Sequence, residues 1–111
     1  MKIAIIGSRD IVVNDLGSFL PSNVTEIISG GARGVDSCAR EYAISNGIKL
    51  TEFLPEYDKY GKAAPLKRNI TIIENADCVL AFWDGKSRGT NFVIENCKKM
   101  GVPIKVLLKK A

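Results

Sequence analysis

The stretch SGGARGVDSCAREYA (residues 29–43) decides how the rest of the sequence is interpreted. It follows VTEIIS (24–29), a mostly apolar run of the kind that forms a buried strand. Beyond its glycines, apolar residues recur at the spacing of one helix face: Val35, Cys38, Ala39, Tyr42 and Ala43. The stretch is therefore a strand-to-helix junction whose turn contains three glycines and an arginine.

The same alternation runs through the whole chain. Strands are predicted at residues 2–6, 24–29, 48–54, 77–83 and 104–108. Apolar residues at helical spacing lie between these strands. They predict a short helix at Leu16, Phe19 and Leu20, which Asn14 can cap, and the helix of the junction described above. Two further helices are marked by Leu66, Ile70 and Ile73, and by Val93, Cys97 and Met100. Residues 55–62 are expected to form a loop. Alternating strands and helices predict an α/β domain over residues 1–111, with parallel strands and helices on both faces of the sheet.

Composition excludes several classes of protein. No apolar run approaches the roughly 20 residues of a membrane span, so we expect a cytoplasmic protein that does not contact a membrane. The chain contains no histidine, which excludes Ser-His-Asp and Cys-His catalysis. Its three cysteines have no metal-ligand spacing, so we expect no metal ion and no cofactor. The net charge of +4 is compatible with an anionic ligand but does not by itself indicate nucleic acid.

Glycine and arginine gather in the loops that follow the strands. These loops are GSRD (7–10), SGGARG (29–34) and WDGKSRGT (83–90), and YGKAAPLKRN (60–69) follows the third strand. Ligands of parallel sheets bind at the carboxyl ends of the strands, where strand order reverses. If the first and fourth strands are neighbours, the loops face one cleft with few acids and five cations: Arg9, Arg33, Lys62, Arg68 and Arg88.

Two glycine loops that each open a helix favour an anion-binding site. The alternative is a pair of plain turns, with Asp36 on its own helix dipole and Asp84 forming a turn. Trp83 either stacks on a base or packs at the end of its strand. The loops do not match GxGxxG, and position 80 is leucine where a P-loop needs glycine, so the common dinucleotide and ATPase motifs are absent.

We therefore expect a ligand site at this edge of the sheet. Arg68, Asp36 and Asp84 are its candidate catalytic residues. The residues expected to bind the ligand are Gly7, Ser8, Arg9, Ser29, Gly30, Gly31, Ala32, Arg33, Gly34, Asp36, Lys62, Arg68, Asn69, Trp83, Asp84, Gly85, Ser87, Arg88, Gly89 and Thr90.

The order and spacing of GSR, SGGARGVDSCAREYA, YGKAAPLKRN and ADCVLAFWDGKSRGT resemble the SLOG superfamily, above all its small single-domain YspA-like branch in bacteria and phages. The resemblance covers nearly the whole chain. It implies a Rossmann-like three-layer α/β/α fold with a five-stranded parallel sheet in the order 3-2-1-4-5. It also implies a nucleotide-type ligand under the two glycine loops. Relatives often pair through helices, so a homodimer is a further expectation.

Two better-known relatives of this branch differ in activity. The Lonely Guy phosphoribohydrolases release the base from nucleoside monophosphates. Their helix arginine matches Arg68, and their PGGxGTxxE loop resembles residues 84–90, but their glutamate falls on Val93 and their proline on Asp84. DNA-processing protein A, which binds single-stranded DNA, has a similar SG-ARG-D loop and a pair like Arg68-Asn69.

The function expected first is therefore binding of a nucleotide or nucleotide-derived small ligand, by a sensor or processing domain. A nucleotide phosphoribohydrolase is the second alternative, and single-stranded nucleic acid binding is the third.

Overall fold

A five-stranded parallel sheet forms the centre of the computed structural model, which describes residues 1–109. Lys110 and Ala111, which the predicted domain includes, lie outside the described residues. The strands are β1 (Lys2–Gly7), β2 (Glu26–Ser29), β3 (Lys49–Glu52), β4 (Cys78–Trp83) and β5 (Ile104–Leu108). Their order is β3-β2-β1-β4-β5, and every neighbouring pair is parallel. The predicted fold class and strand order are confirmed.

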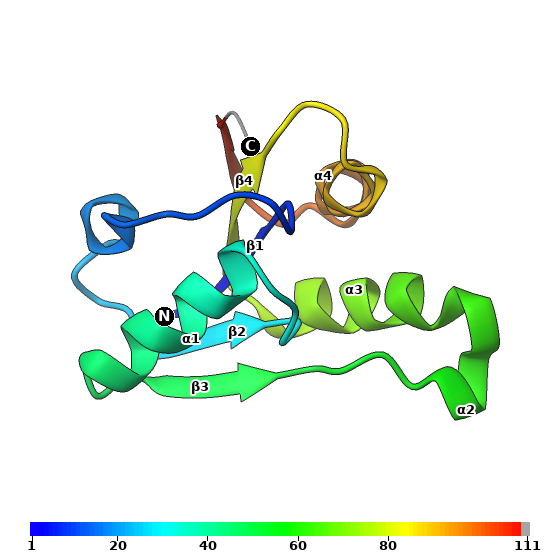
Figure 1. Cartoon of the computed structure of the whole chain (residues 1–111), viewed down its shortest axis with the longest axis horizontal. Helices are drawn as coiled ribbons and strands as arrows, with labels where there is room; N and C mark the ends of the chain where they lie inside the picture. Colours follow the sequence, from blue (N-terminus) through cyan, green and yellow to red (C-terminus); the bar gives the residue numbers. More distant parts are fainter. Residues whose placement is uncertain (110–111) are drawn as a thin grey trace.

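Helices cover both faces of this sheet, as Figure 1 shows. The long helices are α1 (Val35–Ser45), α3 (Ala64–Asn75) and α4 (Arg88–Met100), and η1 (Leu16–Phe19) is a single 3₁₀ turn. Side chains of β1 alternate between the faces because successive residues of a strand point in opposite directions. Ile3 and Ile5 join the core beneath α1 and η1, whereas Ala4 and Ile6 join the core beneath α3 and α4.

The connection between β3 and α3 differs from the prediction. Residues 55–62 were expected to be a loop, but the chain forms a short helix, α2 (Tyr57–Tyr60), and a 3₁₀ turn, η2 (Gly61–Ala63). Neither α2 nor η2 buries a side chain, so this segment has no apolar face that the sequence could reveal. Together with the start of α3 it stands out from the rest of the molecule, at the right of Figure 1. Asn14 does not cap the first helix either, because Asp15 holds the N-cap position of η1.

The strand order determines where a ligand crevice is expected. Strand order runs outward from β1 through β2 to β3, and the chain then returns to the other side of β1 at β4. The carboxyl ends of β1 and β4 therefore flank the point at which the order reverses, where ligands of open parallel sheets bind. No helix among residues 1–109 is long and apolar enough to cross a membrane.

Candidate functional site

A cavity of about 450 Å³ opens at the carboxyl ends of the strands. This volume is within the range of small-molecule sites. Loops after β1, β2 and β4 and one face of α3 form its walls. The predicted site residues that line it are Gly7, Ser8, Arg9, Gly30, Ala32, Arg33, Asp36, Arg68, Asn69, Asp84, Ser87, Gly89 and Thr90.

Other predicted site residues lie outside the cavity wall. Lys62 is exposed in η2, on the protruding connection, and Arg88 is exposed at the start of α4, so the expected cluster of five cations does not form there. The remaining residues outside the wall belong to the same loops and strand ends: Ser29, Gly31, Gly34, Trp83 and Gly85.

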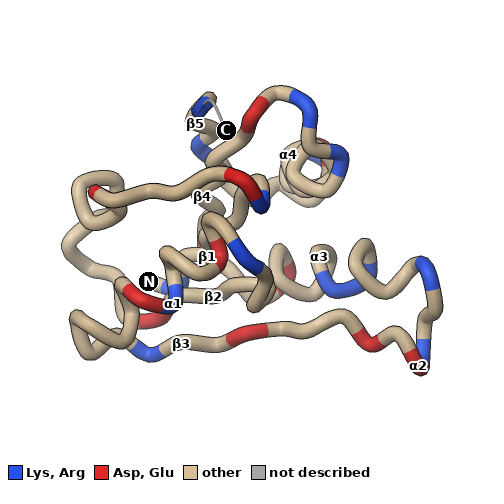
Figure 2. Tube along the Cα trace, in the orientation of Figure 1, with Lys and Arg blue, Asp and Glu red and all other residues tan. Residues whose placement is uncertain are grey.

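Some residues that line the cavity were not among the predicted site residues. Lys86 lines it beside Asp84, and Asp10 lines it beside Arg9. The expectation of few acids is wrong, because three carboxylates share the cavity with four cations. Figure 2 shows acidic positions beside basic ones along these loops.

Lys86 and Asp10 belong to loops that the sequence analysis had identified, so their position in these loops was the signal that could have found them. The apolar part of the wall comes from Ile6, Pro65, Ile72 and Val93.

Two glycines bring the loops together by packing against neighbouring elements. A Cβ on Gly7 would stand 2.5 Å from the Phe82 carbonyl oxygen and 2.6 Å from the Val35 side chain. A Cβ on Gly34 would collide with the backbone of Arg9, and Gly34 has a φ of 72°, which favours glycine. These glycines let α1 begin close against the ends of β1 and β4.

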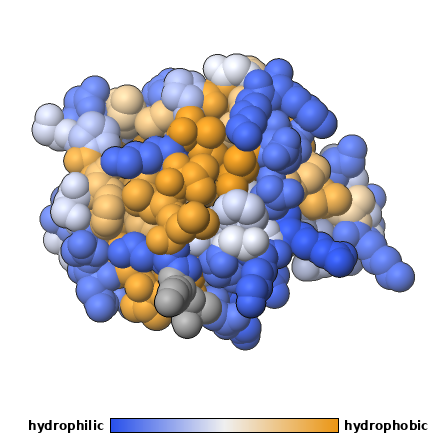
Figure 3. All heavy atoms as spheres, turned by 90° about the horizontal axis from the view of Figure 1, so that it is seen from above, coloured by the Kyte–Doolittle hydropathy of each residue, from blue (hydrophilic) through white to orange (hydrophobic). Residues whose placement is uncertain are grey.

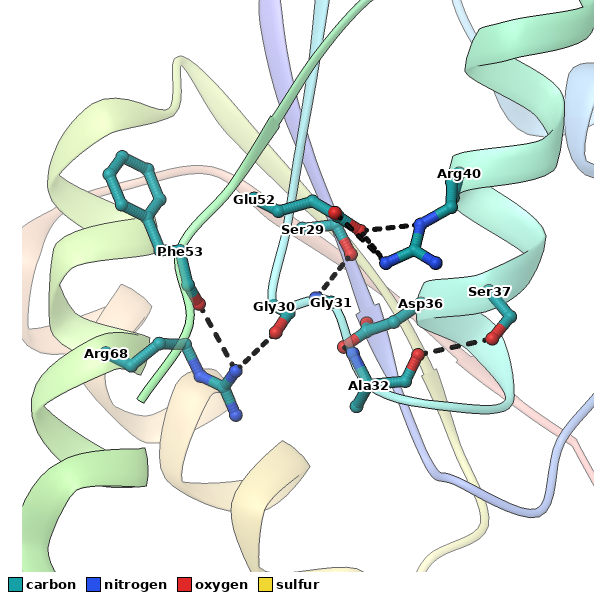
Figure 4. A network of polar contacts seen from close by, with 10 residues as sticks. All are labelled: Ser29, Gly30, Gly31, Ala32, Asp36, Ser37, Arg40, Glu52, Phe53 and Arg68. Carbon is teal, nitrogen blue, oxygen red and sulfur yellow. Dashed lines mark hydrogen bonds and ion pairs between the residues drawn. The ribbon is translucent and has the colours of Figure 1, made fainter. Parts of the chain in front are cut away.

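Arg68 ties α3 to two loops across the cavity wall (Figure 4). Its Nη1 donates to the Gly30 carbonyl at 2.7 Å and to the Phe53 carbonyl at 3.3 Å, while Nε donates to Asn69 Oδ1 at 2.9 Å. Burial lowers the pKa of Arg68, an effect opposed by the nearby Asp36 carboxylate, but a guanidinium stays charged at any physiological pH. Arg68 is thus a positioning residue for the loop after β2.

Asp36 is a buried carboxyl at the start of α1. Its Oδ2 accepts the Ala32 amide at 3.1 Å, which closes the loop after β2 onto the helix (Figure 4). Only 8% of the residue is exposed. Burial raises its pKa, and the Ala32 hydrogen bond and the Arg68 charge oppose that rise. Asp36 therefore holds its own loop against the start of α1.

Asp84 organises the loop after β4. Its Oδ1 accepts the backbone amides of Lys86 at 2.8 Å and Ser87 at 2.7 Å, and these bonds lower its pKa. The Asp84 amide donates to Ser8 Oγ, which joins this loop to the loop after β1. Asp84 forms a turn, which was one of its two predicted roles.

Trp83 packs at the end of β4. Its Nε1 donates to the Ser87 carbonyl at 3.0 Å, so the indole holds the loop that leads into α4. Neither α1 nor α4 has a side-chain cap on its first amides. Both helices therefore begin beside the cavity with amide groups and a partial positive charge that an anion can satisfy.

Comparisons with known proteins agree with this architecture. The model of the family described as DNA recombination-mediator protein A matches residues 1–83. The Gene 61 protein of Mycobacterium phage D29 is similar, with 34% identity over 84 residues, which covers 70% of this chain and 67% of the phage protein. No solved structure matches significantly. The matched region includes β1 to β4, and thus two of the three loops around the cavity.

Proposed function

Because the chain belongs to the family of DNA recombination-mediator protein A, we propose that its cavity binds a nucleotide through the phosphate group. One observation carries the proposal: two uncapped helix starts and four cationic side chains meet in one cavity. Backbone amides at helix starts bind phosphate, and nearby arginine and lysine side chains add charge-assisted hydrogen bonds.

The acids of the cavity do not remove this attraction. Asp84 is engaged by two amides of its own loop, and Asp10 faces Arg33 at 3.4 Å in an exposed ion pair. Exposed pairs of this kind contribute little, so Arg33 can turn toward a ligand at small cost. The half-buried Arg68 keeps its charge next to Asp36.

We propose binding without cleavage of the nucleotide. Val93 lines the cavity and is 1% exposed, and it occupies the position of the glutamate of the Lonely Guy phosphoribohydrolases. A buried valine cannot stabilise positive charge on the sugar as a glycosidic bond breaks. Asp36 and Asp84 already accept hydrogen bonds from loop amides.

Single-stranded DNA is the second candidate ligand, and the family match favours it. In that case the cavity holds one backbone phosphate or terminal nucleotide of the strand. A mononucleotide and an oligonucleotide then compete for the same loops, because both place a phosphate at the helix starts.

Calorimetric titration tests the proposal, with deoxynucleoside monophosphates, the matching nucleosides and short single-stranded oligonucleotides. Lys86→Ala is expected to weaken monophosphate binding roughly tenfold, since a contact with a charged group contributes about 1.4 kcal/mol or more. Lys98→Ala, an exposed lysine near the other end of α4, is the matched control and should bind like the wild type.

The ligands separate the alternatives. Nucleosides that bind as tightly as their monophosphates would contradict phosphate recognition. Oligonucleotides that bind much more tightly than monophosphates would favour the second candidate. Release of free base, followed by chromatography, would contradict binding without cleavage.

A further inference from the structure

The two edges of the sheet carry different side chains. The edge strand β3 has lysine, threonine and glutamate in four residues, and Lys49 and Glu52 form ion pairs with Glu26 and Arg40. The other edge strand, β5, exposes apolar side chains: Val106 is 37% exposed and Leu108 is 73% exposed. Figure 3, which views the molecule from the side of β4 and β5, shows a continuous apolar area there. Natural edge strands are usually protected by charge, and β3 fits that rule better than β5.

Within residues 1–109, the β5 backbone pairs with one strand only, β4. The Lys109 amide donates to the Trp83 carbonyl, and the Pro103 carbonyl accepts the Val79 amide. In a parallel ladder the residues that bond one neighbour alternate along the strand. Residues 105 and 107 thus direct their amides and carbonyls toward β4. The intervening residues direct theirs away from the sheet: Ile104, Val106 and Leu108.

We infer that β5 pairs with β5 of a second copy of this chain, antiparallel and with the two-fold axis at Val106. In this register Val106 exchanges two hydrogen bonds with its own symmetry mate, and Ile104 pairs with Leu108 of the other copy. The three outward-directed residues of each copy are all used, and the two sheets become one.

The side chains of β5 fit this register. Ile104, Val106 and Leu108 lie on the face covered by α4, where Ile104 packs against the core. Pairing makes one apolar stripe from both copies on that face. On the other face Lys105 lies opposite Leu107 of the second copy, so the two Lys105 charges are not directly opposed. A one-residue shift of the pairing would place Val106, which directs its amide and carbonyl outward, opposite a residue that directs its own toward β4, so the hydrogen bonds between the copies would be lost.

Cysteine cross-linking tests the register. Residues directly opposite in a hydrogen-bonded antiparallel pair have Cα atoms about 5.5 Å apart, within the range that a disulfide spans. Oxidised Val106→Cys should therefore give a covalent dimer. Lys105→Cys lies on the same strand, one residue from the axis. It is therefore offset by two residues from its symmetry mate, about 8 Å away by strand geometry, and should not cross-link. The wild type, with its three native cysteines, and Ile44→Cys on α1 are the controls.

Light scattering after size exclusion tests the dimer itself. Val106→Pro removes an outward amide that β4 does not use, and Leu108→Lys adds a charge to an exposed position, so both variants should remain folded by circular dichroism. Each should raise the dimer dissociation constant at least tenfold, whereas Ile44→Lys, at a similarly exposed position, should leave it unchanged. A wild type that is monomeric across the micromolar range would overturn the inference. So would a dimer that survives both β5 substitutions, or one that cross-links through position 105 instead of 106.

Discussion

At the scale of single residues, Arg68 links three elements in the cavity wall. It was expected at the site from its place in the connection after the third strand and from its match to a family arginine. Its bonds to the carbonyls of Gly30 and Phe53 depend on how three elements pack, so no local pattern predicts them. A Cβ on Gly30 would stand 2.5 Å from Arg68 Nη1, so glycine at this position also makes room for the Arg68 side chain.

The buried carboxyl of Asp36 makes the stability of the protein depend on pH. Because burial raises its pKa, the folded protein holds this proton more tightly than the unfolded chain does. The free energy of unfolding contributed by this group therefore falls as pH rises from about 3.9, the ordinary aspartate pKa, through the raised value. Asp36→Asn keeps an oxygen for the Ala32 amide and removes the buried charge. We expect the variant to be more stable than the wild type at neutral pH.

Urea denaturation from pH 4 to pH 8 measures this effect. The stability difference between Asp36→Asn and wild type should shrink as pH falls toward the ordinary aspartate pKa, since the wild-type carboxyl then becomes neutral as well. A difference that stays constant over this range would show that the substitution acts through packing or hydrogen bonding instead of charge.

At the scale of elements, hydrophobic spacing predicted the strands and helices that pack on the core and missed the elements that do not. Alternating apolar runs located five strands, and the family resemblance supplied their order, both of which the structure confirms. The short helix α2 and the turn η2 were missed because neither buries a side chain, whereas η1, which is equally short, buries Leu16 and was located. The predicted position of Lys62 was therefore wrong as well, because it depends on the path of the connection between β3 and α3. Lys86 was missed because only the conformation of its loop turns it toward the cavity.

The loop from β4 to α4 gives the second prediction. By charge alone, Asp84→Ala should strengthen phosphate binding, because it removes a carboxylate from the cavity wall. We expect the opposite, a loss of affinity of roughly fivefold, because the two amide bonds that fix Lys86 and Ser87 disappear and the loop must be ordered on binding. Asp84→Asn, which keeps one acceptor oxygen, should lie between the alanine variant and the wild type.

Isothermal titration with one nucleoside monophosphate, at fixed ionic strength, compares the three proteins. Tighter binding by Asp84→Ala would mean that the carboxylate repels the ligand more than it organises the loop. The pKa of Asp84 is lowered, so the loop should keep this order until the pH is well into the acid range.

At the scale of the molecule, the site and the core are parts of one structure. Gly7 of β1 packs on α1, Ser8 bonds the loop after β4, and Arg68 of α3 bonds the loop after β2. These contacts couple the shape of the cavity to the sheet and helices. We expect the cavity and the core to unfold together.

The single tryptophan makes this expectation measurable. Trp83 ends β4 and bonds the Ser87 carbonyl, so its fluorescence reports on the cavity loop, whereas far-ultraviolet circular dichroism reports on all helices and strands. In a two-state protein the two signals give the same transition. A nucleotide that binds the folded chain alone, present at about 100 times its dissociation constant, should add about 2.7 kcal/mol to the free energy of unfolding and shift both curves equally. If Trp83 fluorescence changes at lower urea than the dichroism, the loop opens before the core and the site is a separate, weaker unit. If a bound nucleotide shifts the fluorescence curve alone, it stabilises only that unit, and the coupling between cavity and core is absent.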